Sequence, residues 1–116
     1  MLKSLPFAGT IKVINKGVDV TVLADRSSVD IAFAASRKLV VCGISTAVLN
    51  ITCFNPIDTK TLAYYEETTP RMIAMNQQIF DAVQPHLRKT TRIALLDGTS
   101  EQALIDAVRT IACRNA

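Results

Sequence analysis

The 116-residue chain contains no tryptophan, one histidine, three cysteines and four glycines. The cysteines (Cys42, Cys53 and Cys113) form no C-x-x-C pair and lie far in sequence from the histidine, which excludes a disulfide framework and the usual spacing of zinc ligands. The glycines, at positions 9, 17, 43 and 98, match neither G-x-G-x-x-G nor G-x-x-x-x-G-K-[ST], the two common phosphate-binding motifs. We therefore expect no metal, no cofactor, and thiols that are buried and reduced.

Long apolar runs and strong charge of one sign are missing too. The longest apolar stretch, Leu39–Phe54, has 16 residues with polar interruptions, short of the ~20 residues that a membrane-spanning helix needs. The N-terminal sequence MLKSLPFAG is too short for the apolar core of a secretion signal. The net charge is +3, with no run of like charges longer than two. We predict a cytoplasmic protein with no membrane contact and no specific signal for nucleic acid.

What is present is the composition of one globular domain, residues 1–116, with 49% hydrophobic and 20% charged residues and no linker-like segment. Residues 11–22 alternate between apolar and polar on both sides of Asn15-Lys16-Gly17. Alternation around a glycine-containing turn is typical of a β-hairpin, so we predict one here.

The middle of the chain leaves two alternatives open. Residues 27–37 alternate as a strand does, but their alanines and the serines before them favour a helix, to which we give a slight preference. Residues 38–44 and 47–54 are apolar and β-branched, which predicts two buried strands or one bent strand. After a turn at Pro56 and Asp58, residues 62–67 fit either a strand or the start of a helix.

The second half predicts two helices around a strand. Thr69-Pro70 is a helix-start signal, and the apolar residues that follow keep helical spacing as far as Val83, with Pro85 ending the helix. Arg92–Leu96 is typical of a buried strand. Asp97-Gly98 predicts a turn, and Thr99 with Gln102 forms a capping box for a last helix from about residue 100.

These elements indicate an α+β domain with a mixed or largely antiparallel sheet of about five strands and the two C-terminal-half helices on one face. The alternative is an α/β sandwich with an extra helix near residues 27–37; the strand order stays open. The residues expected in the core are Ile11, Val13, Val20, Val22, Val40, Val41, Leu49, Ile51, Met75, Ile79, Val83, Ile93, Leu95, Leu104, Val108 and Ile111.

Groups that could carry catalysis are few. His86 is the only usual general base, and its position beside Pro85 at a helix end favours a structural role. An enzyme that uses His86 with Asp97 or Glu67 is the hypothesis we place last. The cluster Arg88, Lys89 and Arg92 favours a solvated surface. The sequence does not decide whether the chain is an enzyme, and it favours a non-enzyme.

Our leading hypothesis is a small non-enzymatic binding or regulatory module that acts through contact with a protein partner or with itself. A homodimer would protect an exposed strand edge. The candidate binding residues, chosen because interface centres favour these types, are Tyr64, Tyr65, Arg71, His86 and Arg88. The alternative is a domain that binds a small apolar ligand in a pocket between sheet and helices, lined by Met72, Met75 and Phe80. The partner, any ligand and the oligomeric state are not predicted.

Overall fold

The computed structural model describes residues 11–54, 57–69, 71–96 and 100–113. They form a five-stranded mixed sheet in the order β1-β3-β2-β4-β5, in which β1 runs antiparallel to β3 and the other pairs are parallel. The strands are β1 (Ile11–Asn15), β2 (Val20–Ala24), β3 (Thr46–Ile51), β4 (Arg71–Ala74) and β5 (Arg92–Leu95). The helices are α1 (Val29–Val41), α2 (Thr59–Thr68), α3 (Gln77–Val83), the short 3-10 helix η1 (Gln84–His86) and α4 (Glu101–Cys113).

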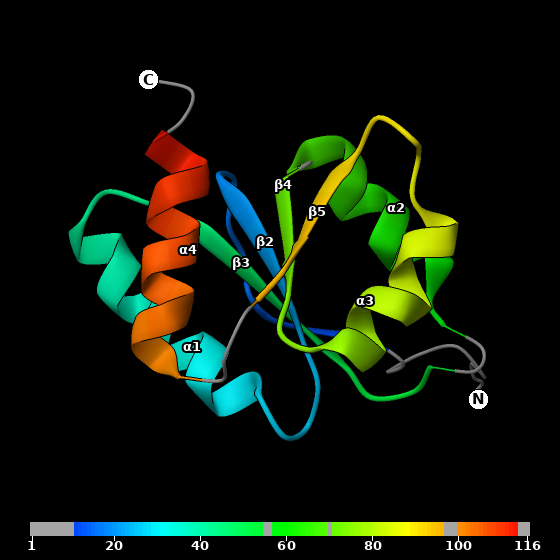
Figure 1. Cartoon of the computed structure of the whole chain (residues 1–116), viewed down its shortest axis with the longest axis horizontal. Helices are drawn as coiled ribbons and strands as arrows, with labels where there is room; N and C mark the ends of the chain where they lie inside the picture. The colour runs from blue at the N-terminus through cyan, green and yellow to red at the C-terminus, as the bar shows by residue number, and fades with distance from the viewer. Residues whose placement is uncertain (1–10, 55–56, 70, 97–99, 114–116) are drawn as a thin grey trace, which may run out of the picture.

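Helices cover both faces of the sheet: α1 and α4 lie on one face, and α2 and α3 on the other (Figure 1). The five strands and the helix near residues 27–37 are confirmed. The placement of the two C-terminal-half helices on one face is wrong, because α3 and α4 lie on opposite faces. Crossovers between parallel strands are right-handed, and the chain crosses the sheet in one direction from β2 to β3 and in the other from β3 to β4 and β5, which places α1 opposite α2 and α3. Helix α4 follows the last strand and packs beside α1.

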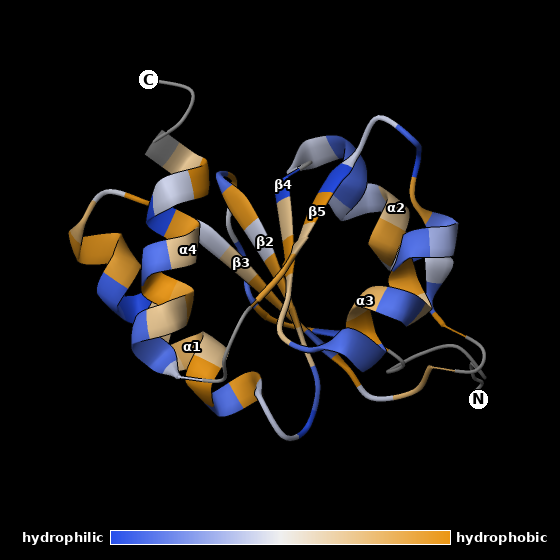
Figure 2. Cartoon of the chain, viewed as in Figure 1, coloured by the Kyte–Doolittle hydropathy of each residue, from blue (hydrophilic) through white to orange (hydrophobic). Residues whose placement is uncertain are grey.

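The core is a continuous apolar layer on each side of β2, β3 and β4. All five residues of β2 are buried, because helices cover both faces of this central strand. Helix α1 turns Ala32, Ala35, Ser36 and Leu39 toward the sheet at helical spacing and packs beside α4. The central strands are largely apolar along their length, whereas the helices carry both apolar and polar residues (Figure 2).

The hairpin predicted over residues 11–22 is wrong. β1 and β2 are both strands, but β3 lies between them and pairs with each. The loop that joins them is held instead by long-range contacts: the backbone N–H of Asp19 donates to Ser45 O at 2.8 Å, and its carboxylate accepts from the N–H of Ser45 at 2.7 Å. Local alternation therefore identified the two strands but not their partner.

The helix predicted over Pro70–Val83 is also wrong in its first half. Residues 71–74 form β4, whose last three residues are buried, and the helix begins only at Gln77. Asn76 caps that helix, since its side-chain oxygen accepts from the N–H of Ile79 at 3.0 Å. A strand covered on both faces is apolar throughout, so its spacing imitates a helical stripe.

The end of α1 corrects one prediction, and α2 resolves an alternative that the sequence left open. Residues 38–41 belong to α1 and are not a strand, whereas β3 confirms the strand predicted within residues 47–54. Residues 62–67 are helical, as part of α2. The last helix is confirmed as α4; the side-chain oxygen of Ser100 accepts from the N–H of Ala103 at 3.0 Å and so caps it. The predicted turn and the Thr99 cap fall outside the described residues.

Most of the expected core is buried, and the exceptions share a cause. Val13, Val40, Val41 and Leu95 are exposed, while Ile93 and Ile111 are half-buried; the other ten predicted core residues are buried. The exposed four lie on edge strands or at the open end of α1, where one side of the backbone has no covering layer. For the same reason β5 is a strand as predicted but not a buried one, and Cys42, just after α1, is exposed.

Among the described residues, no helix is both long and apolar enough to cross a membrane. The cytoplasmic location stays a prediction.

Candidate functional site

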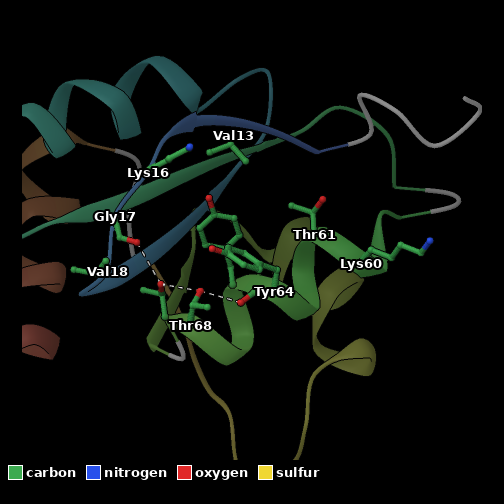
Figure 3. Close-up of a pocket in the computed structure, with 10 residues that line it drawn as sticks. Val13, Lys16, Gly17, Val18, Lys60, Thr61, Tyr64 and Thr68 are labelled. Carbon is green, nitrogen blue, oxygen red and sulfur yellow. Dashed lines mark hydrogen bonds between the residues drawn. The ribbon is translucent and has the colours of Figure 1, made fainter. Parts of the chain in front are cut away.

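A surface groove lies between α2 and the loop that joins β1 to β2 (Figure 3). Its volume is about 580 Å³. On the loop side it is lined by Val13, Lys16, Gly17 and Val18, and on the helix side by residues of α2 that include Lys60, Thr61, Tyr64 and Tyr65. We call it the α2 groove.

The α2 wall of the groove is set by a side-chain cap. The carboxylate of Asp58 accepts from the backbone N–H of Thr61 at 3.1 Å and from the hydroxyl of Thr61 at 2.6 Å, which fixes the first turn of α2. The helix then buries Leu62, Tyr65 and Glu66 against the core. Tyr64 is one position away from this buried face and therefore points outward.

Tyr64 and Tyr65 form one aromatic pair with two different environments. Their ring centres are 5.1 Å apart and the planes meet at 81°, an edge-to-face contact. Tyr65 is 6% exposed, whereas Tyr64 is 61% exposed. Burial and then the neighbouring Tyr64 raise the pKa of Tyr65, so its phenol stays protonated at neutral pH. The buried ring supports the exposed one, which can contact a partner.

The loop wall is held in place by long-range hydrogen bonds. The Thr69 hydroxyl at the end of α2 donates to Gly17 O at 3.3 Å (Figure 3). The Thr21 hydroxyl of β2 donates to Thr69 O at 3.2 Å. The backbone N–H of Val18 donates to the Ser45 hydroxyl at 3.2 Å. Gly17 packs so closely on β3 that an added Cβ would lie 2.3 Å from Ala47 N. Both walls are therefore fixed by the fold, and the groove needs no partner to form.

The groove combines exposed apolar side chains with a lysine on each wall. Val13, Val18 and Tyr64 are exposed large hydrophobic residues. Lys16 comes from the loop wall, and Lys60 extends outward from α2 (Figure 3). No described carboxylate forms an ion pair with either lysine. This combination suits a segment that has an apolar anchor and negative charges beside it.

The structure brings together only two of the five residues predicted to bind. Tyr64 and Tyr65 line the groove, while Arg71 lies half-buried on β4, His86 lies exposed in η1, and Arg88 lies in the loop after η1. The role of these five residues stays a prediction. Glu67, the proposed catalytic partner of His86, is exposed, and Asp97 lies outside the described residues.

Several features of the site were not foreseen. Val18, Lys16 and Lys60 were not singled out, because nothing local in the sequence places residues 16–18 beside α2. The apolar pocket predicted at Met72, Met75 and Phe80 is not one of the cavities described: both methionines are fully buried in the core, and Phe80 packs half-buried against it. Methionine at these positions fills space between sheet and helices.

Comparison with known proteins finds a matching family and a relative. The family model described as transketolase, C-terminal domain matches residues 9–97. A 1-deoxy-D-xylulose-5-phosphate synthase from Desulforudis audaxviator is 31% identical over 78 residues, which cover 67% of this chain and 12% of that protein. The chain therefore spans a small part of the length of this relative.

Solved structures show the same fold at low identity. A split-gene transketolase, described as an inactive β4 tetramer, has a TM-score of 0.75 and 17% identity over 89% of this chain and 41% of its own. A 2-oxoglutarate:ferredoxin oxidoreductase from Magnetococcus marinus has a TM-score of 0.74 and 13% identity over 91% of this chain and 20% of its own.

These findings overturn the hypothesis of a non-enzymatic binding or regulatory module. The family match covers most of the chain, and the similar proteins are enzymes of which a domain like this one forms a part. The sequence carried no short motif that could have revealed this, because the match lies in the whole pattern of the sheet and helices. The chain belongs to the transketolase C-terminal domain family.

Proposed function

We propose that this chain is an assembly domain of a transketolase-type enzyme and that its α2 groove packs against another domain of that enzyme. The observation that carries the proposal is the preformed groove, in which Tyr64 and Val18 are 61% and 73% exposed although both flank fixed walls. Exposed apolar side chains gathered around a cavity are typical of interaction surfaces. Tyrosine is a common anchor residue in interfaces, and the ring of Tyr64 packs against the buried ring of Tyr65.

The charges define the partner segment. Lys16 and Lys60 have no described acidic partner, so the occupant we propose carries an aliphatic or aromatic anchor with aspartate or glutamate on either side. A segment from another domain of the same enzyme is supported by the relatives, since domains of this family form 12% to 41% of the longer chains that match.

The test uses a polypeptide that carries the other domains of a transketolase-type enzyme. Its association with this domain is measured by isothermal titration calorimetry at low and high salt. We expect Tyr64→Asp and Val18→Asp each to weaken association by about tenfold or more, as loss of an interface anchor does. We expect Lys60→Glu to weaken it less at high salt than at low salt.

The matched control is Val41→Asp, at a residue that is 88% exposed at the end of α1, on the other face of the sheet. It should leave the affinity within about twofold, as surface changes outside an interface do. Association that survives both groove substitutions, or that Val41→Asp weakens equally, would rule out the groove as the contact.

A second candidate is self-association through the edge of β5. β5 is the last strand in the sheet order, and Leu95 on it is 40% exposed. The opposite edge is less open to pairing, because β1 carries Lys12, is followed by Lys16, and has a register shift between Val13 and Asn15. Light scattering over a range of protein concentrations tests this. A dimer that Leu95→Glu abolishes and Val41→Asp leaves intact would support it; a monomer at all concentrations would refute it.

A further inference from the structure

A second cavity lies on a different part of the molecule, at the carboxyl ends of β2 and β3. Its volume is about 660 Å³. Arg26 and Ser27, in the turn after β2, line the cavity together with Gln78 of α3, the helix that follows β4. The adjacent strands β2 and β4 continue into α1 and α3, which lie on opposite faces of the sheet. In open α/β sheets, ligands bind in the crevice outside the carboxyl ends of the strands, where the connections diverge in this way. We call this cavity the carboxyl-end crevice.

Asn50, one of the residues that line the crevice, has a side-chain acceptor without a donor. The side-chain oxygen Oδ1 of Asn50, on β3, is buried and has no hydrogen-bond partner among the described residues. A buried acceptor left without a partner destabilises a fold, and a ligand that brings a donor removes that cost. Asn50 therefore favours a ligand that carries a hydroxyl or similar donor.

Two cations flank this acceptor. Lys12 of β1 lies directly opposite Asn50 in the antiparallel pair, so their side chains share one face of the sheet. Arg26, in the turn after β2, lines the same cavity. Both residues are exposed, and no described carboxylate forms an ion pair with either. The positive charge is therefore available to an anion.

The one described carboxylate that lines the crevice, Asp25, is engaged by its own turn. Its Oδ1 accepts from the Ser27 N–H at 3.1 Å and from the hydroxyls of Ser27 and Ser28 at 2.7 and 2.9 Å. Its Oδ2 accepts from Asn76 Nδ2 at 3.0 Å. Both oxygens of the carboxylate are therefore occupied by hydrogen bonds from neighbouring hydroxyl, backbone and side-chain amide groups. Asp25 fixes the turn that presents Arg26, and we assign it no contact with the ligand.

We propose that the carboxyl-end crevice binds a small hydroxylated anion. Lys12 and Arg26 bind its carboxylate or phosphate group, Asn50 Oδ1 accepts a hydrogen bond from its hydroxyl, and Val29 and Phe54 contact its carbon skeleton. The site is separate from the α2 groove and does not depend on the assembly function proposed above.

Calorimetric titration of the full chain tests the proposal with two hydroxylated anions, D-glycerate and glycerol 3-phosphate, and with two fragments, inorganic phosphate and glycerol. We expect at least one hydroxylated anion to bind saturably and more tightly than phosphate does. We expect no binding of glycerol. Tighter binding of glycerate assigns a carboxylate ligand, and tighter binding of glycerol 3-phosphate assigns a phosphate ligand.

Three substitutions localise the binding. Arg26→Gln and Lys12→Gln are at exposed positions and leave the core intact. Each should lower the affinity for the hydroxylated anion by about tenfold, as loss of a charge-assisted hydrogen bond does. Asn50→Ala should lower the affinity for the hydroxylated anion about threefold to tenfold while changing the affinity for phosphate by less than about twofold. Arg109→Gln, which removes an exposed cation on α4 outside both cavities, is the matched control and should have no effect.

Two results would overturn the proposal. One is the absence of saturable binding of both hydroxylated anions up to about 10 mM, a range in which even weak sites fill. The other is binding that Arg109→Gln reduces as much as Arg26→Gln does, which would show attraction by overall charge. Failure of either kind leaves the assembly experiment unaffected, because that experiment uses different residues and a protein ligand.

Discussion

The carboxylate of Glu66 accepts a hydrogen bond from the backbone N–H of Arg88, at 2.6 Å from nitrogen to oxygen. The same oxygen also accepts from the hydroxyl of Thr91. Glu66 is buried on α2, and its two donors lie in the loop between η1 and β5. This acid therefore ties the groove-forming helix to the loop that leads into the edge strand.

Replacing Glu66 tests this connection. Glu66→Ala should lower the free energy of unfolding by about 2–3 kcal/mol, because it removes a charged acceptor and leaves two donors without their partner. Glu66→Gln keeps an acceptor of the same length and should cost about half as much. The measurement is urea unfolding at neutral pH.

Glu67 is the natural control, since it is the next residue of α2 and is exposed. Glu67→Ala should change stability by less than about 0.5 kcal/mol. Equal losses for Glu66→Ala and Glu67→Ala would contradict the role given to Glu66.

Asp25 should make the stability of the domain sensitive to acid. Burial raises the pKa of this carboxyl, but hydrogen bonds from Asn76, Ser27 and Ser28 outweigh burial and hold the pKa below its ordinary value of 3.8. A carboxyl with a lowered folded-state pKa stabilises the fold above its unfolded-state pKa, and that stabilisation is lost as pH falls through the folded-state pKa.

Asp25→Ala should therefore cost about 1–3 kcal/mol at pH 7, and the difference from the parent chain should shrink below about pH 4. Unfolding curves at a series of pH values measure it. Asp30→Ala, in the exposed first turn of α1, removes only a helix-dipole interaction and should cost less than about 1 kcal/mol. A difference for Asp25→Ala that stays constant down to pH 2 would show that the charge of Asp25 does not stabilise the fold.

Gly17→Ala should destabilise the domain by about 1–3 kcal/mol, because the new methyl group would overlap the backbone of β3 at Thr46 and Ala47. Thermal unfolding measures the loss. Gly43→Asn is the comparison: Gly43 has a φ of 81°, which asparagine tolerates, and no atom near its added Cβ, so the cost should stay below about 1 kcal/mol. If Gly17→Ala melted at the parent temperature, the close packing of the loop on β3 would be refuted.

Sequence patterns predicted the first two strands better than they predicted how those strands pair. Residues 11–15 and 20–24 were recognised as strands, because alternation and β-branched residues report on each strand alone. The partner of each is β3, more than twenty residues further on, and no local signal reports on it. A short turn sequence favoured a hairpin that long-range packing replaced.

β4 shows why helical spacing misled the prediction at Pro70. Met72, Ile73 and Ala74 are buried on both faces of the sheet, so apolar residues occur there without a two-residue period. Met72 and Met75 then happened to continue the stripe of Ile79 and Val83. Such a run does not distinguish a covered strand from a helix, and the decisive signal was the cap at Asn76.

The candidate sites depend on contacts that the sequence does not display. Tyr64-Tyr65 stood out by residue type, yet the groove forms because the fold brings Gly17 beside Thr69, 52 residues away, to which it is hydrogen-bonded. Likewise, Lys12 and Asn50 face each other only through the antiparallel register of β1 and β3. The residue types could be read from the sequence, but which of them lie side by side could be known only from the sheet topology.

The position of β3 has a consequence for synthesis on the ribosome. β1 and β2 are joined by residues 16–19 alone, yet neither can complete its backbone hydrogen bonding until Thr46–Ile51 inserts between them. A nascent chain that has emerged only as far as α1 therefore lacks the strand with which both β1 and β2 pair, a state exposed to association with other chains. Emergence of β3 is then the event that commits the first half of the domain to its native topology.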